Sequence, residues 1–396
     1  SPSPLSAWVS LVRQGAAVAG NARPGTKLED LGSNYVTNVF DKARDAGFNL
    51  VRLFAHGEET SFMLQTAPGA YDESIWRGLD YIIAVAGSRG VRALVVPINN
   101  WLSPHVGDGK GTYVEWAGLP ESASDEFWTN GRTRQMVRDH FNVMLNRRNV
   151  FTGRAWKDEP AIFGFNLFNE PRCPHAQDKE GCPEVVTGWI NEMAGHIKSI
   201  DTHHLVTVGE EGFFEYDSGL KDADPWGIPE NVAPMGRYWS ASVGQDFTRQ
   251  HAGSSIDFAA IHMWPDNWNT TELAFPPVWI DTHIQESRKI GKPLIMEEFG
   301  KQSNGAGDKQ PYYDAVYGAL LNSLANGDNF RGALFWRWAE DGGNDATTVQ
   351  TGDATWQTVM RYTKEISEKY QGKPVAGCSP VGDATPAVAA SSIEGK

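Results

Sequence analysis

The sequence predicts an α/β protein built as a single (β/α)8 barrel of the TIM type, with long loops after its strands. Two observations predict this fold: short apolar runs alternate with amphipathic helical segments, and polar and aromatic residues gather where the apolar runs end. Strands separated by helices must be parallel, and parallel strands buried on both faces are continuous apolar runs. A chain of 396 residues is long enough to close such a barrel.

Strand and helix alternate in a regular order along the chain. The segments that fit buried strands are 48–54, 91–97, 161–168, 204–209, 256–262, 293–300 and 332–338. Between and around them, apolar residues recur at helical spacing in the segments 34–46, 75–89, 132–147, 185–200, 278–290, 312–324 and 355–368. Gly47 and Gly90 stand where the first two of these helices need a left-handed cap.

A closed eight-stranded barrel needs one further strand before residue 34, and the only candidate is the weak segment 15–21, GAAVAGN. The alternative is an open doubly wound sheet, but no dinucleotide glycine fingerprint follows any strand. We expect the barrel to occupy residues 1–373. From Pro374 the chain becomes rich in Ala, Ser, Pro and Gly, so 374–396 is predicted to be a tail or linker that a further domain could follow.

Composition limits the partners. Hydrophobic residues make up 40% of the chain and charged residues 21%, as in a folded globular protein. The net charge of −14 disfavours nucleic acid and anionic membranes as partners, and no apolar run approaches the length of a membrane span. Fifteen Trp and eleven Tyr suit flat, half-apolar ligands such as sugar rings, although a Trp-rich core is the alternative.

Three cysteines bear on the compartment. Cys173 and Cys182 are nine residues apart in a segment dense in Pro, Gly and charge, which is a plausible small disulfide loop. Such a pair indicates a protein outside the cytosol, and a chain that begins at Ser1 is compatible with removal of a leader. Cys378 is left free or pairs outside this chain.

In a barrel of this kind the functional residues lie at the carboxyl ends of the strands. The residues found there form an unusual set: Arg52, His56, Asn99, Asn100, Trp101, Asn169, Glu170, Glu210, Glu211, His262, Trp264, Glu297, Glu298, Trp336 and Trp338. His203 and His204 begin a strand instead, so we interpret them as structural.

Two carboxylates on different strands, Glu170 and Glu298, suggest cleavage of a glycosidic bond. That reaction needs one protonated and one ionised carboxyl group, and a separation of roughly 5 to 5.5 Å between them gives retention of configuration. A raised pKa of Glu170, caused by partial burial and the nearby second carboxylate, would leave Glu298 ionised. Each acid also has a structural alternative, as a helix cap or a partner of arginine. Glu297 competes with Glu298, because alternation in a strand should turn only one toward the barrel axis.

The chain resembles a known family at these residues. NLFNEPRC at 166–173, VGEEGFF at 208–214, IHMWPDNW at 261–268, EEFGK at 297–301 and ALFWRW at 333–338 follow the order of retaining glycoside hydrolases with a (β/α)8 barrel. They are most similar to family 5 endo-β-1,4-mannanases of plants and fungi, over residues from about 34 to 370.

The resemblance implies a secreted, monomeric enzyme that cleaves β-mannan and manno-oligosaccharides without a metal or cofactor. It implies Glu170 as acid/base and Glu298 as nucleophile. Asn169 would bind the sugar 2-hydroxyl, Arg52 and His262 would hold the nucleophile ionised and oriented, and Trp336 would lie under the sugar at the cleavage point. A cellulase or another β-glycanase is the nearest alternative. An inactive sugar-binding protein is disfavoured because it needs no pair of costly carboxylates.

The sequence departs from this family in two places. The family usually has Tyr two residues after the histidine, where this chain has Trp264, whose indole N–H can donate a hydrogen bond but not accept one. The first strand, with its aromatic pair, is not recognisable. Trp101 and Trp116 are candidates to stack on sugars, and Glu211 is either a residue of a sugar subsite or part of a structural salt bridge. No H-E-x-x-H or Cys-rich spacing indicates a metal.

Overall fold

The computed structural model describes residues 6–57, 62–101, 109–173, 182–214, 243–268, 270–303, 308–339 and 346–370, with the side chains of 6–10 left aside. The predicted tail, 374–396, lies outside these ranges together with Cys378, so both assignments stay predictions. Within these ranges, no helix combines the length and the apolar character that crossing a membrane requires.

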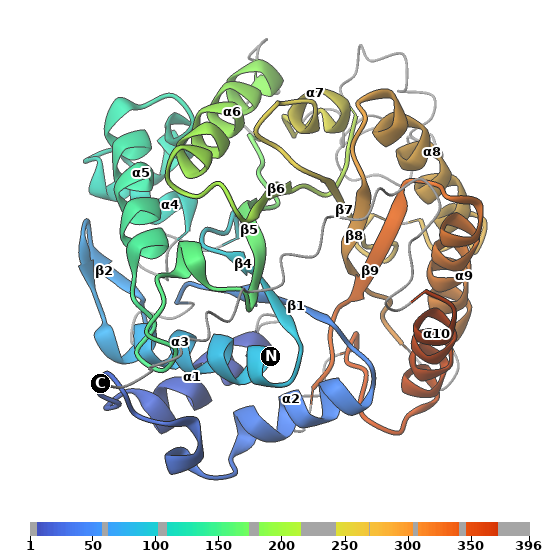
Figure 1. Ribbon diagram of the computed structural model, residues 1–396. Coiled ribbons are helices and arrows are strands. Elements are labelled where there is room, and N and C mark those ends of the chain that lie inside the picture. Colours follow the sequence, from blue (N-terminus) through green and yellow to red (C-terminus); the bar gives the residue numbers. More distant parts are fainter. Residues whose placement is uncertain are drawn as a thin grey trace, which may run out of the picture.

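Seven parallel strands curve around a common axis in the described part of the chain (Figure 1). The first sheet has the order β1 (Leu50–Phe54), β4 (Arg92–Val96), β5 (Ile162–Asn169) and β6 (Leu205–Gly209), and the second has the order β7 (Ala259–Met263), β8 (Leu294–Phe299) and β9 (Phe330–Phe335). The two sheets meet where the amide of Asp257 donates to the carbonyl of Val206 at 2.8 Å, just before β7. A short antiparallel hairpin, β2 (Gln65–Ala67) and β3 (Ala70–Tyr71), lies apart from them.

Helices surround the strands on the outside (Figure 1). Seven of them correspond to predicted segments: α2 (Tyr35–Asp45), α3 (Glu73–Ser88), α5 (Gly131–Asn146), α6 (Cys182–Ile200), α8 (Phe275–Lys289), α9 (Gln310–Asn326) and α10 (Ala354–Tyr370). The others are α1 (Ser6–Ala19), α4 (Lys110–Trp116), α7 (Phe247–His251) and the short 3-10 helices at Leu28–Leu31, Glu121–Phe127 and Trp156–Asp158. The predicted alternation of strand and helix, and with it the barrel class, is confirmed.

The predicted first strand is wrong. Residues 15–19 of the segment 15–21 are the last turn of α1, and the segment pairs with no strand. The helix packs closely on α3 because small residues meet there: a Cβ added to Gly78 would lie 2.5 Å from the backbone nitrogen of Ala16. No sheet pairing joins β1 to β9 in the described part of the chain.

Apolar side chains divide into an outer core and a barrel floor. The outer core fills the space between strands and helices, where large side chains such as Trp76, Trp156 and Trp189 are buried. The barrel floor, as we use the term, is the inner cluster of Leu94, Phe258, Ala260 and Ile295 with Leu50, Phe163, Leu205 and Leu334 packed on it. The floor closes one end of the barrel, and the polar residues lie beyond it toward the carboxyl ends of the strands.

Candidate active site

Glu170 follows directly after β5 in an unusual backbone conformation. Its φ is 51°, and it is the only non-glycine residue with positive φ in the described part of the chain. Such a conformation costs roughly 1–2 kcal/mol for an L-residue. The backbone amide of Glu170 donates to the carbonyl of Gly209 at 2.6 Å, which ties the end of β5 to the end of β6. The chain thereby turns out of the strand at Glu170, whose side chain is buried.

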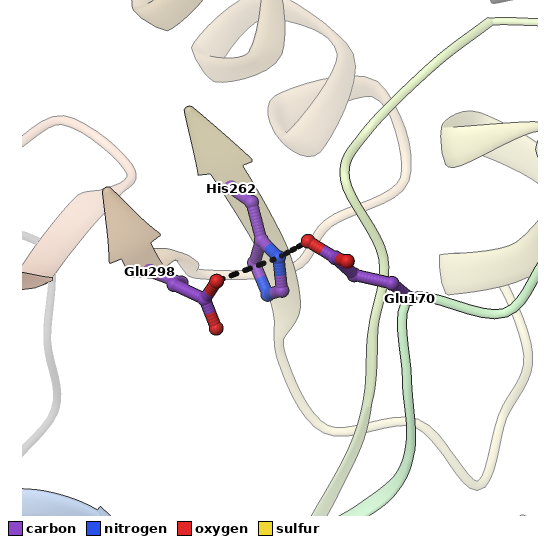
Figure 2. Close-up of side chains that lie close together, drawn as sticks. All are labelled: Glu170, His262 and Glu298. Carbon is purple, nitrogen blue, oxygen red and sulfur yellow. Dashed lines mark hydrogen bonds and ion pairs between the residues drawn. The ribbon is translucent and has the colours of Figure 1, made fainter. Parts of the chain in front are cut away.

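Glu170, which follows β5, converges with His262 on β7 and Glu298 on β8, as Figure 2 shows. One side-chain oxygen of each glutamate and one nitrogen of the histidine all lie within 4.8 Å of one another, and all three residues are buried. Nδ1 of His262 is 2.7 Å from Oε1 of Glu170 and 4.0 Å from Oε1 of Glu298. The two carboxyl groups are therefore close together, as retaining glycosidases require, without the wider gap that admits a water in inverting ones.

Two donors hold the carboxylate of Glu298. Nη1 of Arg52 donates to Oε2 at 2.6 Å, and the indole Nε1 of Trp264 donates to Oε1 at 2.9 Å. Trp264 therefore makes the hydrogen bond that its N–H allows, at the position where the family usually has Tyr. A buried carboxylate with two such donors, one of them charged, is fixed in direction.

Asn169 lies beside the carboxylates and is itself held on both sides. Its Oδ1 accepts from Nη2 of Arg52 at 2.7 Å, and its Nδ2 donates to Oδ1 of Asn99 at 2.9 Å. The amide orientation is set by the arginine, which can only donate. Binding of a sugar hydroxyl by Asn169 stays a prediction.

The tryptophans predicted to contact sugar occupy different environments. Trp336 is buried and packs edge-on against Trp264 at 6.5 Å and Phe54 at 5.8 Å between ring centroids. Trp101 is 49% exposed, and its indole N–H donates to Oε2 of Glu170. Trp116 ends α4 and packs, partly buried, against the outer core with its ring edge-on to Tyr113 at 5.4 Å, and its contact with sugar stays a prediction.

Glu211 forms a salt bridge. Both of its oxygens accept hydrogen bonds from the guanidinium of Arg172: Nε donates to Oε2 at 2.7 Å, and Nη2 donates to Oε1. The side-chain amide of Gln245 also donates to Oε2, at 3.0 Å. The guanidinium of Arg172 also lies 4.8 Å from the ring centroid of Trp101. Of the two sequence interpretations of Glu211, the geometry matches the salt bridge, which supports Trp101 through Arg172.

The expectation that only one of Glu297 and Glu298 faces the barrel interior is wrong. The carboxylate of Glu297 is fully buried and reaches Arg52, His262 and Asn166. Regular alternation fails here because the register of β8 shifts against both neighbours, between Ile261 and His262 on β7 and between Met296 and Phe299 on β8. A local irregularity of this kind turns consecutive side chains to the same side.

The electrostatics of the site also differ from the expectation. Burial raises the pKa of Glu170, but the hydrogen bond and charge of His262 outweigh it, so this pKa lies below its usual value. Burial lowers the pKa of His262, whereas Glu298, Glu170 and Glu297 together raise it to about 10. For Glu298, burial and the charge of Glu170 raise the pKa against the opposing charges of His262 and Arg52. Without substrate, these two directions favour a proton on His262 over one on Glu170.

Sequence reasoning missed two residues of this site. Asn166, in the middle of β5, donates from Nδ2 to both oxygens of Glu297 at 2.6 and 2.8 Å. An amide inside an otherwise apolar buried strand was a usable signal, because such a group must find a partner. Arg172 stands in the quoted motif NLFNEPRC, but its residue type alone did not indicate a role in the site, since most arginines lie at the surface.

Cys173 and Cys182 form a disulfide, with their Cα atoms 6.3 Å apart. The bond joins the residues that follow Glu170 to the first residue of α6. It thereby limits how far the segment that carries Arg172 can move from the barrel.

Comparison with known proteins places the chain in a family. The family model described as GH family 5 beta-mannosidase-like matches residues 28–222 and 235–362. The chain belongs to GH family 5. Among its relatives, mannan endo-1,4-beta-mannosidase 1 of Arabidopsis thaliana is 34% identical over 316 residues, which cover 76% of this chain and 72% of that protein. Mannan endo-1,4-beta-mannosidase 4 of Solanum lycopersicum is 34% identical over 356 residues, covering 87% of this chain and 81% of that protein.

Solved structures agree with this family 5 assignment. The hyperthermostable endo-1,4-beta-D-mannanase of Thermotoga petrophila superposes with a TM-score of 0.73 at 25% identity, covering 87% of this chain and 99% of that one. The endo-1,4-beta-mannanase of Rhizomucor miehei gives a TM-score of 0.69 at 27% identity, covering 88% and 95%. The resemblance stated from the motifs is confirmed, and the family is one of retaining glycoside hydrolases.

Proposed function

We propose that this chain is a retaining, endo-acting glycoside hydrolase that cleaves β-1,4-mannosidic bonds in mannan, glucomannan or galactomannan. The observation that carries the proposal is the pair Glu170 and Glu298, whose oxygens approach within 4.8 Å at the carboxyl ends of β5 and β8. The choice of mannan follows from the relatives, whose names state that they act on it.

The reaction proceeds by double displacement. Glu298 attacks the anomeric carbon while the bond to the leaving oxygen breaks and Glu170 gives that oxygen a proton, which leaves a glycosyl-enzyme. Water then attacks the same carbon, Glu170 takes the proton of the water, and Glu298 is released. Arg52 and Trp264 aim the nucleophile through the hydrogen bonds described above. The scheme uses two carboxyl groups and water, with no metal or other cofactor.

Asn169 and the tryptophans complete the proposed sugar site. Asn169 would bind the 2-hydroxyl with the orientation that Arg52 sets. Trp336 would lie under the sugar at the cleavage point, and Trp101, half exposed beside Glu170, would face the sugar on the leaving side. An aromatic ring and a sugar ring both present flat, partly apolar faces.

Secretion and a monomeric state belong to the same proposal. The disulfide between Cys173 and Cys182 supports an oxidising compartment, and polymeric mannan is an extracellular substrate. Size-exclusion chromatography with light scattering measures the mass in solution, and a dimer would reject the monomer.

Release of reducing ends from mannan, cellulose and xylan tests the proposed activity. We expect a rapid fall in the viscosity of mannan with few bonds cut, as endo-action requires, and little release from the other two polymers. Preferential release from cellulose would favour the alternative of a cellulase on the same barrel. Binding of manno-oligosaccharides with no release from any polymer would favour an inactive sugar-binding protein.

A further inference from the structure

Glu297 is a third carboxylate beneath the proposed catalytic pair, and the double-displacement scheme does not use it. Its side chain is fully buried. Three donors share Oε1: Nδ2 of Asn166 at 2.6 Å, Nη2 of Arg52 at 3.1 Å and Nε2 of His262 at 3.1 Å. Burial raises the pKa of Glu297, but the charge of Arg52 and the bond from His262 bring it below its usual value, so the group is ionised.

The barrel leaves room for this carboxylate at Gly209, the last residue of β6. A Cβ there would lie 2.5 Å from Oε1 of Glu297, 2.6 Å from Nδ2 of Asn166 and 2.7 Å from Nη2 of Arg52. Any side chain at 209 would therefore force the charged groups apart. Five strands thus contribute to a closed site for one negative charge: Arg52 is on β1, Asn166 on β5, Gly209 on β6, His262 on β7 and Glu297 itself on β8.

Two contacts connect Glu297 to the proposed catalytic carboxylates. Through Arg52 it reaches Glu298, because Nη1 of the same guanidinium donates to Glu298 at 2.6 Å. The second contact runs through His262. Its Nε2 contacts Glu297, and its Nδ1 lies 2.7 Å from Oε1 of Glu170. An ionised Glu297 accepts only, so Nε2 of His262 carries a proton and Nδ1 faces Glu170.

Several titratable groups lie at or near His262 and Glu297. They are Arg52 on β1, Glu170 after β5, Glu210 and Glu211 after β6, His251 on α7 and Glu298 on β8. Burial and neighbouring acids raise the pKa of Glu210 well above its usual range, and burial lowers that of His251 to about 4. Glu211 is paired with Arg172. The neighbouring acids that raise the pKa of His262 are Glu298, Glu170 and Glu297.

We propose that Glu297 is a positioning residue that acts through His262 to supply the proton of Glu170. The N–H bond at Nδ1 of His262 breaks as the O–H bond of Glu170 forms, and Glu170 passes that proton to the leaving oxygen. When Glu170 later takes a proton from water, it returns it to Nδ1. The negative charge of Glu297 keeps the imidazole protonated until the step occurs. This inference rests on the proposed function for its catalytic part only.

The substitution Glu297→Gln removes the charge and keeps the shape. Because an anion next to His262 favours its protonated form, its removal lowers the pKa of the His262–Glu170 pair, by about one unit or more for charges this close. The imidazole resonances of His262, identified by their absence in His262→Asn, report this in the enzyme without substrate. We expect protonation up to about pH 10 in the parent chain and titration at least one unit lower in Glu297→Gln.

The kinetic counterpart is the basic limb of the profile of kcat/KM against pH on a manno-oligosaccharide. It should move to lower pH in Glu297→Gln by the same amount as the titration of His262. Glu159→Gln is the matched control, since Glu159 is a buried glutamate at the amino end of β5 that accepts from Thr152 at 2.5 Å, and it should leave both readouts unchanged.

The outcomes separate the two proposals. An unchanged pKa of His262 in Glu297→Gln overturns the positioning role, even if activity falls. If the pKa of His262 falls in Glu297→Gln but the parent chain cleaves no mannan, the effect of Glu297 on His262 is upheld and the proposed function is rejected. If Glu297→Gln does not fold, Glu297→Asp is measured instead. Its shorter side chain draws the charge away from Nε2, so a smaller shift in the same direction is expected, and no shift contradicts the proposal.

Discussion

The barrel floor and the carboxyl ends of the strands belong to the same strands but differ in what they bury: the floor buries apolar side chains, and the strand ends bury charged ones. On β8, Ile295 belongs to the floor, and two residues later Glu297 is a buried anion. On β1, Leu50 packs on the floor and Arg52 lies among the carboxylates. Apolar burial stabilises the fold by roughly 25 cal/mol per Å2, whereas each buried charge costs several kcal/mol before its partners offset it.

The comparison teaches where stability and function are separated. Substitutions in the floor should change the free energy of unfolding and leave the pH dependence of the reaction alone. Substitutions among the charged groups should change rates and pH profiles by far more than they change stability. A variant that breaks this division would show that the two layers are coupled.

The largest effect is expected for Glu170→Gln. Loss of the proton donor should lower kcat on mannan by roughly 10²- to 10⁴-fold, the usual contribution of general acid–base catalysis. Binding of a manno-oligosaccharide, measured by calorimetry, should persist because the shape of the site is kept. Hydrolysis at the rate of the parent chain would reject the assignment of Glu170.

A smaller loss is expected for Trp264→Phe, which removes the N–H that Glu298 accepts at 2.9 Å. Hydrogen bonds to charged groups contribute about 1.5–3 kcal/mol, so kcat/KM should fall roughly 10- to 100-fold. Trp156→Phe is the control, since Trp156 also donates its N–H to a buried carboxylate, that of Asp80 at 2.8 Å, but lies in the outer core. Equal losses in the two variants would mean that the effect of Trp264 is one of packing.

Leu94→Ala tests the floor. Leu94 is fully buried, and truncation of a buried leucine costs about 2–5 kcal/mol of the free energy of unfolding. Urea unfolding measures this loss. The basic limb of the profile of kcat/KM against pH should not move, and a shift of that limb would show that the floor sets the charges above it.

A further effect concerns the pH dependence of stability. The pKa of His262 is about 10 in the folded chain against 6.5 for a free imidazole, so the folded state holds a proton that the unfolded state releases. This contribution is complete below pH 6.5 and is lost as pH rises toward 10. The free energy of unfolding should fall less over this range in His262→Asn than in the parent chain. His203→Asn, at an exposed histidine, should keep the slope of the parent chain.

The sequence was sufficient for most of the fold because buried parallel strands and amphipathic helices leave clear patterns. It failed at 15–21, where Gly, Ala and Val fit a strand or a helix equally well. The helix is decided by contacts outside the segment: Leu11 and Val12, one turn earlier, are buried, and Gly78 on α3 allows close approach. Such tertiary contacts override weak local preference.

The residues of the site were predictable, but the hydrogen bonds and ion pairs between them were less so. Strand ends placed Glu170, Glu298, Arg52 and His262 together, because carboxyl ends of parallel strands meet at one end of a barrel. The role of Glu297 was missed because a register shift leaves no mark in the sequence. The direction of the pKa of Glu170 was missed because it depends on a 2.7 Å contact with His262 rather than on the distance to Glu298.

The anomeric form of the first product tests the central claim most directly. A β-linked manno-oligosaccharide is mixed with the enzyme, and proton NMR follows the new reducing end before the anomers equilibrate. Attack by Glu298 followed by water predicts that the β-anomer appears first. First appearance of the α-anomer would mean that water attacks directly, and the nucleophilic role of Glu298 would be rejected.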